Sequence, residues 1–388
     1  MTLGSTASWL IFIAFGIKAA FPLLNGWLQD AYPEATVVGT VVLSAFTTKL
    51  AIYALARGFA GTELLIVVGC LMTAFPVFFA VIENDMRRVL AYSLNNQLGF
   101  MVVAIGIGTE LAINGAVAHA FAHIIYKGLL FMSMGAVLYR VGTVKASELG
   151  GLYKSMPLTM VFCVIGAMSI SAFPLFSGFA AKSLIMSALG YKGLIAAYLV
   201  LLAASAGVLH HSGIKIPYFA FFGHDRGFKV NEAPLSMLIA MGIAAGLCVA
   251  IGIAPQMLYS LLPYEVTYKV WDAGHVLGEL QLLLFAVLAF AFLMVRGLYP
   301  PEIDSTVLNT DWLFRKAAPA LWRMMANPVM RLWHAGLATT TRQIGVAMDR
   351  GTHISRNNYL ISGTATIGAA AGLFLAVFAL LLALRYMM

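Results

Sequence analysis

Charge is scarce in this sequence. Only 10% of the 388 residues are Asp, Glu, Lys or Arg, and 61% are hydrophobic, whereas a soluble globular chain carries about 25% charged residues. This deficit excludes a soluble domain. It predicts an all-α polytopic membrane protein, because lipid demands a backbone whose hydrogen bonds are satisfied within each segment.

Cysteine and cofactor motifs are also scarce. The three cysteines, Cys70, Cys163 and Cys248, all lie in apolar runs, which excludes a disulfide framework and a zinc or haem spacing. There is no Walker A motif, no GxGxxG opening a helix after a strand, and no signal peptide apart from the first span. We therefore expect no catalytic constellation, no cofactor and no metal.

Ten apolar runs are long enough to cross a bilayer as helices. They lie at 6–24, 35–56, 62–82, 90–109, 111–139, 158–190, 193–214, 235–257, 278–298 and 360–384. The first contains Pro22 and the sixth contains Pro174 and Gly178, so we expect two broken helices, each continued by a half-helix. The segments AFPLLNG and AFPLFSG at these breaks match at five of seven positions, which favours a repeat of the inverted type found in transporters.

The run from 111 to 140 carries three ionisable side chains although it is long and apolar. His119, His123 and Lys127 are four residues apart and therefore share one helical face. An ionisable group at bilayer depth costs several kcal/mol unless it faces protein, water or a partner. The pattern favours a proton relay. The alternative is that each His bonds a neighbouring helix and Lys127 reaches the membrane surface.

Cations are distributed unevenly between the two sides of the spans. Sixteen Lys and Arg fall in the loops of one side, among them Lys215, and four in those of the other. The positive-inside rule places the cation-rich side in the cytoplasm, as in a bacterial inner membrane, and an even number of spans places both termini outside. This distribution argues against a nucleic-acid partner.

The remaining four cations, all lysines, fall within spans: Lys18, Lys49, Lys127 and Lys182. Lysine gains and loses a proton when desolvated, which arginine effectively cannot do. The alternative is that Lys127 and Lys182, which lie nearer the span ends, reach the surface. The pair His210–His211 with His224 fits either a proton exit or surface histidines, of which the second is commoner.

The segment 300–358 is polar, opens with acids such as Glu302, and becomes basic and rich in Trp. It suits an amphipathic helix on the cytoplasmic headgroups, or a docking arm for another subunit. The chain is thereby divided into 1–57 (remnant of a first repeat), 58–232 (second repeat), 233–299 (additional spans), 300–358 (cytoplasmic arm) and 359–388 (C-terminal span).

Three segments resemble the antiporter-like subunits shared by respiratory complex I and the Mrp-type cation/proton antiporters. They are GIKAAFPL with WLQDA (16–31), DMRRVLAYS (85–93), and the His119–Lys127 run followed by Gly150-Gly151-Leu152. Lys182 in the second broken helix, together with the basic, Trp-rich C-terminal extension, is most similar to the D-type subunit of an Mrp antiporter. Gln29 stands where the family usually has Pro, and Asn25 where a His is common.

The resemblance implies a role for each ionisable residue. Lys18 would be the lysine that a Glu modulates, Lys49 the link between half-channels, His119 and His123 the central axis, and Lys182 the terminal site. In the family the Lys-containing broken helix is near the seventh of about fourteen, whereas here it is the first. By our assignment 11 of the 16 carboxylates fall in cytoplasmic loops and 5 at the outer side, which leaves none for the membrane interior. We therefore expect a separate small subunit of about six helices that places a Glu near Lys18.

The function expected from these residues is proton translocation along a Lys/His axis, in exchange for Na⁺, within a multisubunit Mrp-type antiporter embedded in lipid with other membrane subunits. One alternative is the same fold in a complex I-like or membrane-bound hydrogenase-like redox pump. Others are a scaffold half that transports nothing and a small-molecule transporter. We expect no enzymatic activity of the chain itself.

Overall fold

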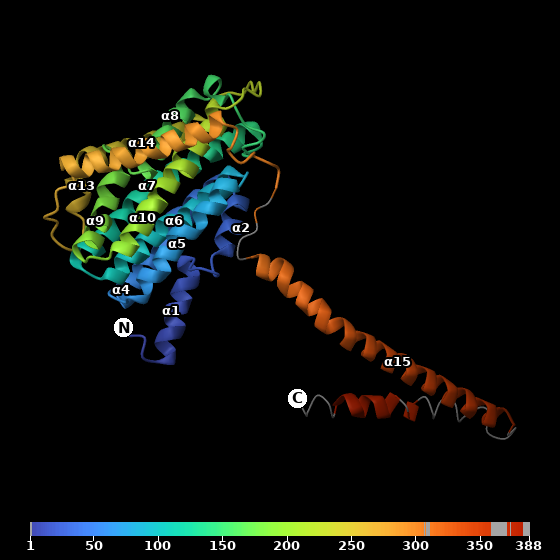
Figure 1. Ribbon diagram of the computed structural model, residues 1–388. Helices are drawn as coiled ribbons and strands as arrows, with labels where there is room; N and C mark the ends of the chain where they lie inside the picture. The colour runs from blue at the N-terminus through green and yellow to red at the C-terminus, as the bar shows by residue number, and fades with distance from the viewer. Residues whose placement is uncertain (1, 306, 308–310, 358–370, 373, 383–388) are drawn as a thin grey trace. The chain divides into compact units, whose positions relative to one another are not determined.

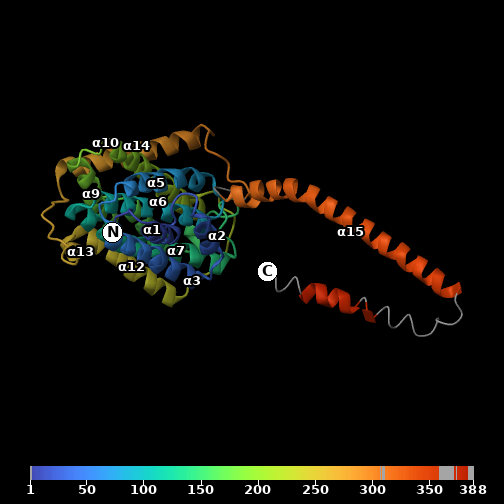
Figure 2. The same cartoon turned by 90° about the horizontal axis from the view of Figure 1, so that it is seen from below.

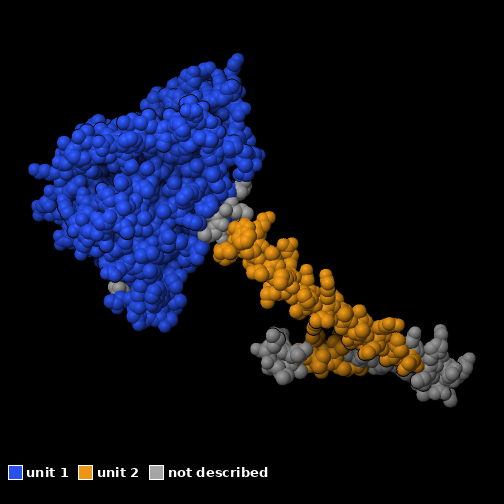
Figure 3. Space-filling model, in the orientation of Figure 1, with its two compact units in different colours: residues 1–311 blue, residues 312–388 orange. Residues whose placement is uncertain are grey.

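The computed structural model describes residues 2–305, 307, 311–357, 371–372 and 374–382. The chain divides into two units, residues 1–311 and 312–388, which Figure 3 shows in different colours. The tenth expected span, 360–384, lies for the most part outside the described residues.

The first unit is a bundle of helices, and no β-strand occurs within the described residues (Figure 1). In chain order the α-helices are α1 (Thr6–Ala19), α2 (Gly26–Glu34), α3 (Val37–Val42), α4 (Thr48–Phe59), α5 (Leu64–Ile82), α6 (Met86–Ile107), α7 (Glu110–Val141), α8 (Pro157–Ile170), α9 (Ser177–Tyr191), α10 (Ile195–Val208), α11 (Lys215–Pro217), α12 (Leu235–Ile253), α13 (Gln256–Tyr259) and α14 (Ala273–Val295). The π-helical turns η1 (Leu43–Thr47), η3 (Leu209–Ile214) and η4 (Tyr218–Phe222), and the 3-10 turn η2 (Leu152–Lys154), complete the unit.

The expectation of an all-α polytopic membrane protein is confirmed. In the described part of the chain seven helical segments are long and apolar enough to cross a membrane. They are Val37–Phe59, Leu64–Ile82, Met86–Ile107, Glu110–Val141, Ile195–Phe222, Leu235–Ile253 and Ala273–Val295. The helix pairs α1–α2 and α8–α9 correspond to the two spans that we expected to be broken.

Helix α6 forms the centre of the bundle. Asp85 caps its N-terminus, because its carboxylate accepts hydrogen bonds from the backbone N–H groups of Arg87 and Arg88, and Gly108 caps its C-terminus in the left-handed conformation. Its most apolar stretch is 94% buried, against 11% for α14. Figure 2 shows α6 and α7 between α14 on one side and α12 on the other. Polar side chains on α6 and α7 therefore face protein.

The two helix breaks have the same backbone conformation. Ala20 and Leu23 in the first, and Ala172 and Leu175 in the second, are the only non-glycine residues with positive φ within the described residues. The backbone hydrogen bonds repeat as well, because Phe21 N–H donates to Gly16 (2.9 Å) as Phe173 N–H donates to Met168 (3.0 Å). The sequence match at Pro22 and Pro174 is thus also a structural match, and such strained conformations concentrate at functional sites.

Gly178 explains how closely the second break is folded. A Cβ atom at this position would collide with the carbonyl oxygen of Ser169 at the end of α8. The hydroxyl groups of Ser169 and Ser177 lie 2.8 Å apart across the same junction. The start of α9 therefore packs directly against the end of α8, and only glycine, which has no Cβ atom, allows this close approach.

The second unit contains η5 (Leu313–Ala317) followed by α15 (Ala318–Asn357), a helix of 40 residues. The tryptophans Trp312, Trp322 and Trp333 are 52%, 72% and 64% exposed. A helix in this arm was expected, and α15 provides it. Its contact with a membrane surface stays a prediction.

Candidate functional site

The ionisable side chains of α7 lie in the interior of the bundle. His119, His123 and Lys127 are all 0% exposed. Neither ring nitrogen of His123, nor Nζ of Lys127, has a hydrogen-bond partner within the described residues. Buried polar atoms are otherwise nearly always bonded, commonly to ordered water. This face of α7 is thus suited to a row of ordered water molecules along the buried side chains.

A chain of hydrogen bonds joins α7 to α6. The hydroxyl group of Tyr126 lies 3.4 Å from Nε2 of His119 and 3.2 Å from Oε1 of Gln97, and the Gln97 amide donates to Asn96 at 2.6 Å. All four side chains are buried. Sequence reasoning missed Tyr126, Gln97 and Asn96 because neutral side chains in an apolar run carry little signal.

Lys49 enters the same interior from α4. Its side chain is buried, and Nζ donates to the carbonyl oxygen of Ser44 at 2.6 Å. Ser44 lies in η1, a π-helical turn. Such a turn leaves carbonyl groups without their usual helical partner, and it often marks a functional position.

Lys182 is held by the second helix break. It is 3% exposed, donates to the carbonyl oxygen of Ile170 at 2.9 Å, and lies 5.1 Å from the centre of the Phe100 ring. The alternative that Lys127 and Lys182 reach the membrane surface is therefore wrong. Both are enclosed, because α6, α7 and α9 pack around them.

Lys18 differs from the other three lysines because it is exposed on α1. It lies 5.7 Å from the centre of the Trp27 ring, and the indole N–H of Trp27 donates to the carbonyl oxygen of Ile17 at 2.9 Å. The structure brings Lys49, Lys127 and Lys182 into one interior with the two histidines and leaves Lys18 on the surface of the unit.

The expectation that no carboxylate lies within the spans is wrong for Glu279. Helix α14 begins at residue 273, five residues before the expected span, so Glu279 lies almost two turns inside it. Glu279 and Lys182 line the same cavity of about 20 Å³, together with His275. That volume is enough for about one water molecule. Lys182 thus has a carboxylate nearby within the chain.

Two larger cavities share lining residues with this one. One, of about 480 Å³, is also lined by Glu279 and His275. The other, of about 540 Å³, shares His275 and is lined by Glu110, Glu265 and Asp272. The three cavities share lining residues, and acids line each of them.

Lys215 was assigned to a loop, and that assignment is wrong. For His211 a proton exit and a surface position were left open, and the surface position is wrong. The helical run continues from Ile195 to Phe222, eight residues beyond the expected span end, because η3 and η4 extend it. Lys215 and His211 are 0% exposed. Their spacing of four residues is the same signal that identified His119 and His123, and it was present in the sequence.

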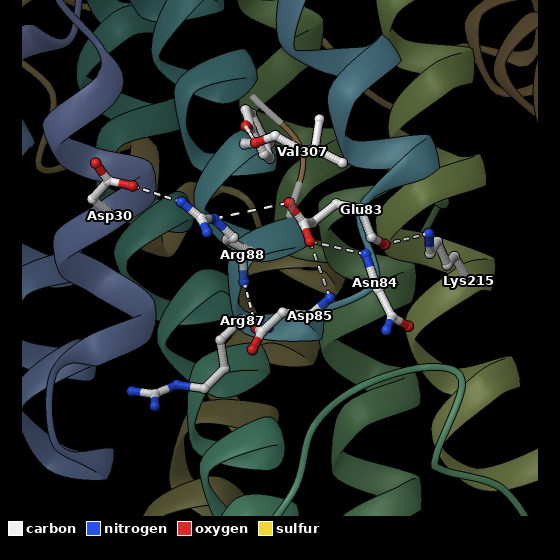
Figure 4. Close-up of polar contacts among 9 residues, drawn as sticks. Asp30, Glu83, Asn84, Asp85, Arg87, Arg88, Lys215 and Val307 are labelled. Carbon is white, nitrogen blue, oxygen red and sulfur yellow. Dashed lines mark hydrogen bonds and ion pairs between the residues drawn. The ribbon is translucent and has the colours of Figure 1, made fainter. Parts of the chain in front are cut away.

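The segments WLQDA and DMRRVLAYS meet at the opposite end of the bundle (Figure 4). Arg88 forms an ion pair with Asp30 at 2.6 Å and lies 3.8 Å from Glu83. Burial raises the pKa of Glu83, and hydrogen bonds and the charge of Arg88 oppose the rise. Arg87 donates to the carbonyl oxygen of Ala35 at 2.8 Å and to the hydroxyl group of Thr40. These contacts fix α6 against the half-helix α2.

Fold and site together define a polytopic membrane protein of the transporter class, in which broken helices surround buried Lys and His. The chain belongs to the NADH:quinone oxidoreductase/Mrp antiporter transmembrane family, whose model matches residues 3–210. The resemblance seen in the sequence is thereby confirmed.

Individual relatives point to two kinds of complex. The chain is 30% identical to Hydrogenase-4 component B of Escherichia coli, in a match that covers 66% of this chain and 43% of that protein. It is 33% identical to the D-type subunit of the Na⁺/H⁺ antiporter of Alkalihalophilus pseudofirmus, in a match that covers 61% of this chain and 51% of that subunit. Among solved structures, the Mrp complex from Dietzia aligns with a TM-score of 0.61 and 27% identity over 65% of this chain and 57% of that one. An archaeal membrane-bound sulfane sulfur reductase aligns with a TM-score of 0.61 and 25% identity, and the alignment covers 97% of this chain and 68% of that one. The chain spans about half the length of the curated relatives it matches.

Proposed function

We propose that this chain is a proton-translocating subunit of a multisubunit monovalent cation/proton antiporter of the Mrp type. The observation that carries the proposal is the buried set Lys49, His119, His123, Lys127 and Lys182, in which several nitrogen atoms have no protein partner within the described residues. The similarity to an Na⁺/H⁺ antiporter subunit supports exchange for Na⁺.

The mechanism we infer is electrostatic hand-off along this set. Two cations a few ångströms apart in a medium of low dielectric repel by several kcal/mol. A proton that arrives at Lys49 therefore favours release from Lys127 or a histidine, and the next release occurs at Lys182. Tyr126 and Gln97 orient His119 beside this line. Glu279 receives the proton, and the acid-lined cavities lead it out.

Lys49→Ala tests this proposal. We expect proton transport by the assembled complex in membrane vesicles to be abolished, because the hand-off loses its first buried base. Lys192→Ala, at an exposed lysine, should leave transport unchanged. Proton flux at the wild-type rate in assembled Lys49→Ala would contradict the relay and favour a scaffold role.

Lys18 supports a further part of the proposal. A lysine on an apolar helix face exposed to lipid is costly, and its neighbours Ile17 and Ile13 are 46% and 43% exposed. We propose that other membrane helices of the complex, from a small partner subunit, cover this face and place a Glu near Lys18. Crosslinking from Ile13→Cys should capture that subunit, and capture of lipid alone would argue against it.

The loops with sixteen cations are proposed to face the cytoplasm of a bacterial inner membrane, with both termini outside. The arm at 300–358 would then follow the cytoplasmic headgroups. Labelling of Ala326→Cys from the cytoplasmic side is expected, and labelling from the outer side would refute this topology.

A second candidate is the same proton-moving role in a redox-driven complex. One observation favours it: the sulfane sulfur reductase structure aligns over 97% of this chain, including the arm, whereas the Mrp structure aligns over 65%. Co-purification of iron–sulfur or flavin proteins with the tagged chain would support this candidate. Na⁺-dependent proton exchange by a complex without them would support the antiporter.

A further inference from the structure

A buried ion pair lies outside the axis just described. Nζ of Lys215 is 2.8 Å from Oε1 of Glu302, and the two side chains are 0% and 7% exposed. Lys215 also donates to the carbonyl oxygens of Val81 and Glu83 at 2.6 and 2.7 Å, and Figure 4 shows its side chain directed at Glu83. Three segments far apart in sequence, at residues 81–83, 215 and 302, therefore meet at one ammonium group.

The pair is bordered by further titratable groups. Glu83 and Arg88 lie on the side of α5 and α6, His211 lies one turn away on η3, and His210 lies against Tyr299 with ring centres 5.5 Å apart. Burial raises the pKa of Glu302, and the charge of Lys215 opposes that rise. Replacement of a buried ion pair by apolar residues is often neutral or stabilising, so the pair is weakly explained by stability alone.

Glu302 also lines a cavity that opens at the cation-rich end of the bundle. The cavity has a volume of about 400 Å³, and its lining includes His224, Arg226 and Tyr299. Oε2 of Glu302 has no hydrogen-bond partner within the described residues. Glu302 is thus placed between this cavity and Lys215.

Inward of Lys215, hydrogen bonds lead toward the axis. Nδ1 of His211 lies 2.8 Å from the Ser212 hydroxyl group, which donates to the Ser93 hydroxyl group on α6 at 2.8 Å. Gln97, the partner of Tyr126, is four residues further along α6 and therefore on the same face. Water commonly bridges polar groups that are too far apart for a direct hydrogen bond. Nε2 of His211 has no protein partner within the described residues.

We propose that Glu302 and Lys215 form a proton-uptake site that feeds the Lys/His axis from the cation-rich end through His211; this rests on the function proposed above. A proton from the cavity bonds to the Glu302 carboxylate. Lys215, now without its counter-ion, releases one proton to His211. The proton on Glu302 then passes to the neutral amine of Lys215 and restores the pair, so one proton enters and one moves inward.

Two replacements separate proton transfer from charge and shape. Glu302→Gln keeps the shape but cannot accept the proton, and Lys215→Arg keeps the charge but cannot release one. In vesicles that contain the assembled complex, each should slow proton uptake from the cation-rich side about a hundredfold. Glu302→Asp should retain uptake with a shifted pH profile. Asp304→Asn, at an exposed carboxylate two residues away that pairs with Lys145 at 2.9 Å, should match the wild type.

The outcomes distinguish this inference from the proposed function. If Lys49→Ala abolishes transport while Lys215→Arg and Glu302→Gln keep the wild-type rate and pH profile, the uptake site is wrong and the relay stands. If Lys49→Ala has no effect, the proposed function fails. If Glu302→Gln does not assemble, Lys215→Arg and Glu302→Asp decide: a wild-type rate with an unshifted pH profile in both overturns the inference.

Discussion

The two helix breaks of this protein share sequence, backbone conformation and a nearby lysine, yet they place that lysine differently. Lys18 before the first break is exposed, whereas Lys182 after the second is 3% exposed. The difference arises from the neighbours: α6, α7 and α14 enclose the second break. The same local structure therefore leaves its lysine on the surface in the first break and places it in an interior site in the second.

The equivalent glycines of the two breaks should give the largest difference in stability. Gly178→Ala forces a Cβ atom against the carbonyl oxygen of Ser169, whereas a Cβ atom at Gly26 would lie 3.6 Å from Asp311, an ordinary contact. We expect Gly178→Ala to lower the free energy of unfolding by about 3 kcal/mol or more. Gly26→Ala should change it by less than about 0.5 kcal/mol. Thermal unfolding of the detergent-solubilised protein measures both, and equal midpoints would show that the breaks are not packed differently.

The carboxylate that shares a cavity with the lysine of the second break should matter strongly for transport. Glu279→Gln should slow proton release about a hundredfold, because the group that shares a cavity with Lys182 no longer accepts a proton. Glu63→Gln, at an exposed acid that lines none of the three acid-lined cavities, serves as the matched control. Proton flux in vesicles is the measurement, and equal rates for the two variants would remove Glu279 from the path.

The link between α6 and α7 should have an intermediate effect. Tyr126→Phe removes the hydroxyl group between His119 and Gln97 without changing the shape of the side chain. We expect flux to fall about tenfold, because the net loss of one or two hydrogen bonds is about 1 kcal/mol each. Tyr139→Phe, at a tyrosine of the same helix that is 60% exposed, should have no effect. An undiminished flux in Tyr126→Phe would mean that His119 needs no such support.

The smallest effect is expected at the exposed break. Trp27→Phe loses the hydrogen bond to Ile17 and weakens the contact with Lys18. The free energy of unfolding should fall by about 1 kcal/mol, with proton flux through Lys182 unchanged. A large loss of flux would show that the first break takes part in conduction within this chain.

Features that depend on local pattern could be predicted from the sequence. The breaks at Pro22 and Pro174 and the shared face of His119, His123 and Lys127 follow from spacing and composition alone. Glu279 and Lys215 could not be placed in the same way. Both lie within a few residues of the expected span ends, and α14 begins earlier and the run after α10 continues further than hydropathy indicates. π-helical turns lengthen a span without an apolar signal.

Exposure of a side chain likewise depends on tertiary neighbours. Lys18 and Lys182 each lie next to one of two similar break segments, and no periodicity tells an exposed lysine from a buried one there. Glu302 follows Pro300-Pro301 in a polar segment, which is typical of a surface, and only the fold shows that it meets Lys215.

Proton flux through the assembled complex that carries Lys127→Arg tests the relay most directly. Lys127 is 0% exposed at the centre of the buried set, and arginine keeps its positive charge but effectively never releases the proton. If protons pass from one Lys or His to the next, the Lys127→Arg variant loses proton flux while the complex still assembles. Flux at the wild-type rate in the assembled variant would show that Lys127 contributes only charge or packing, and the relay through this chain would be wrong.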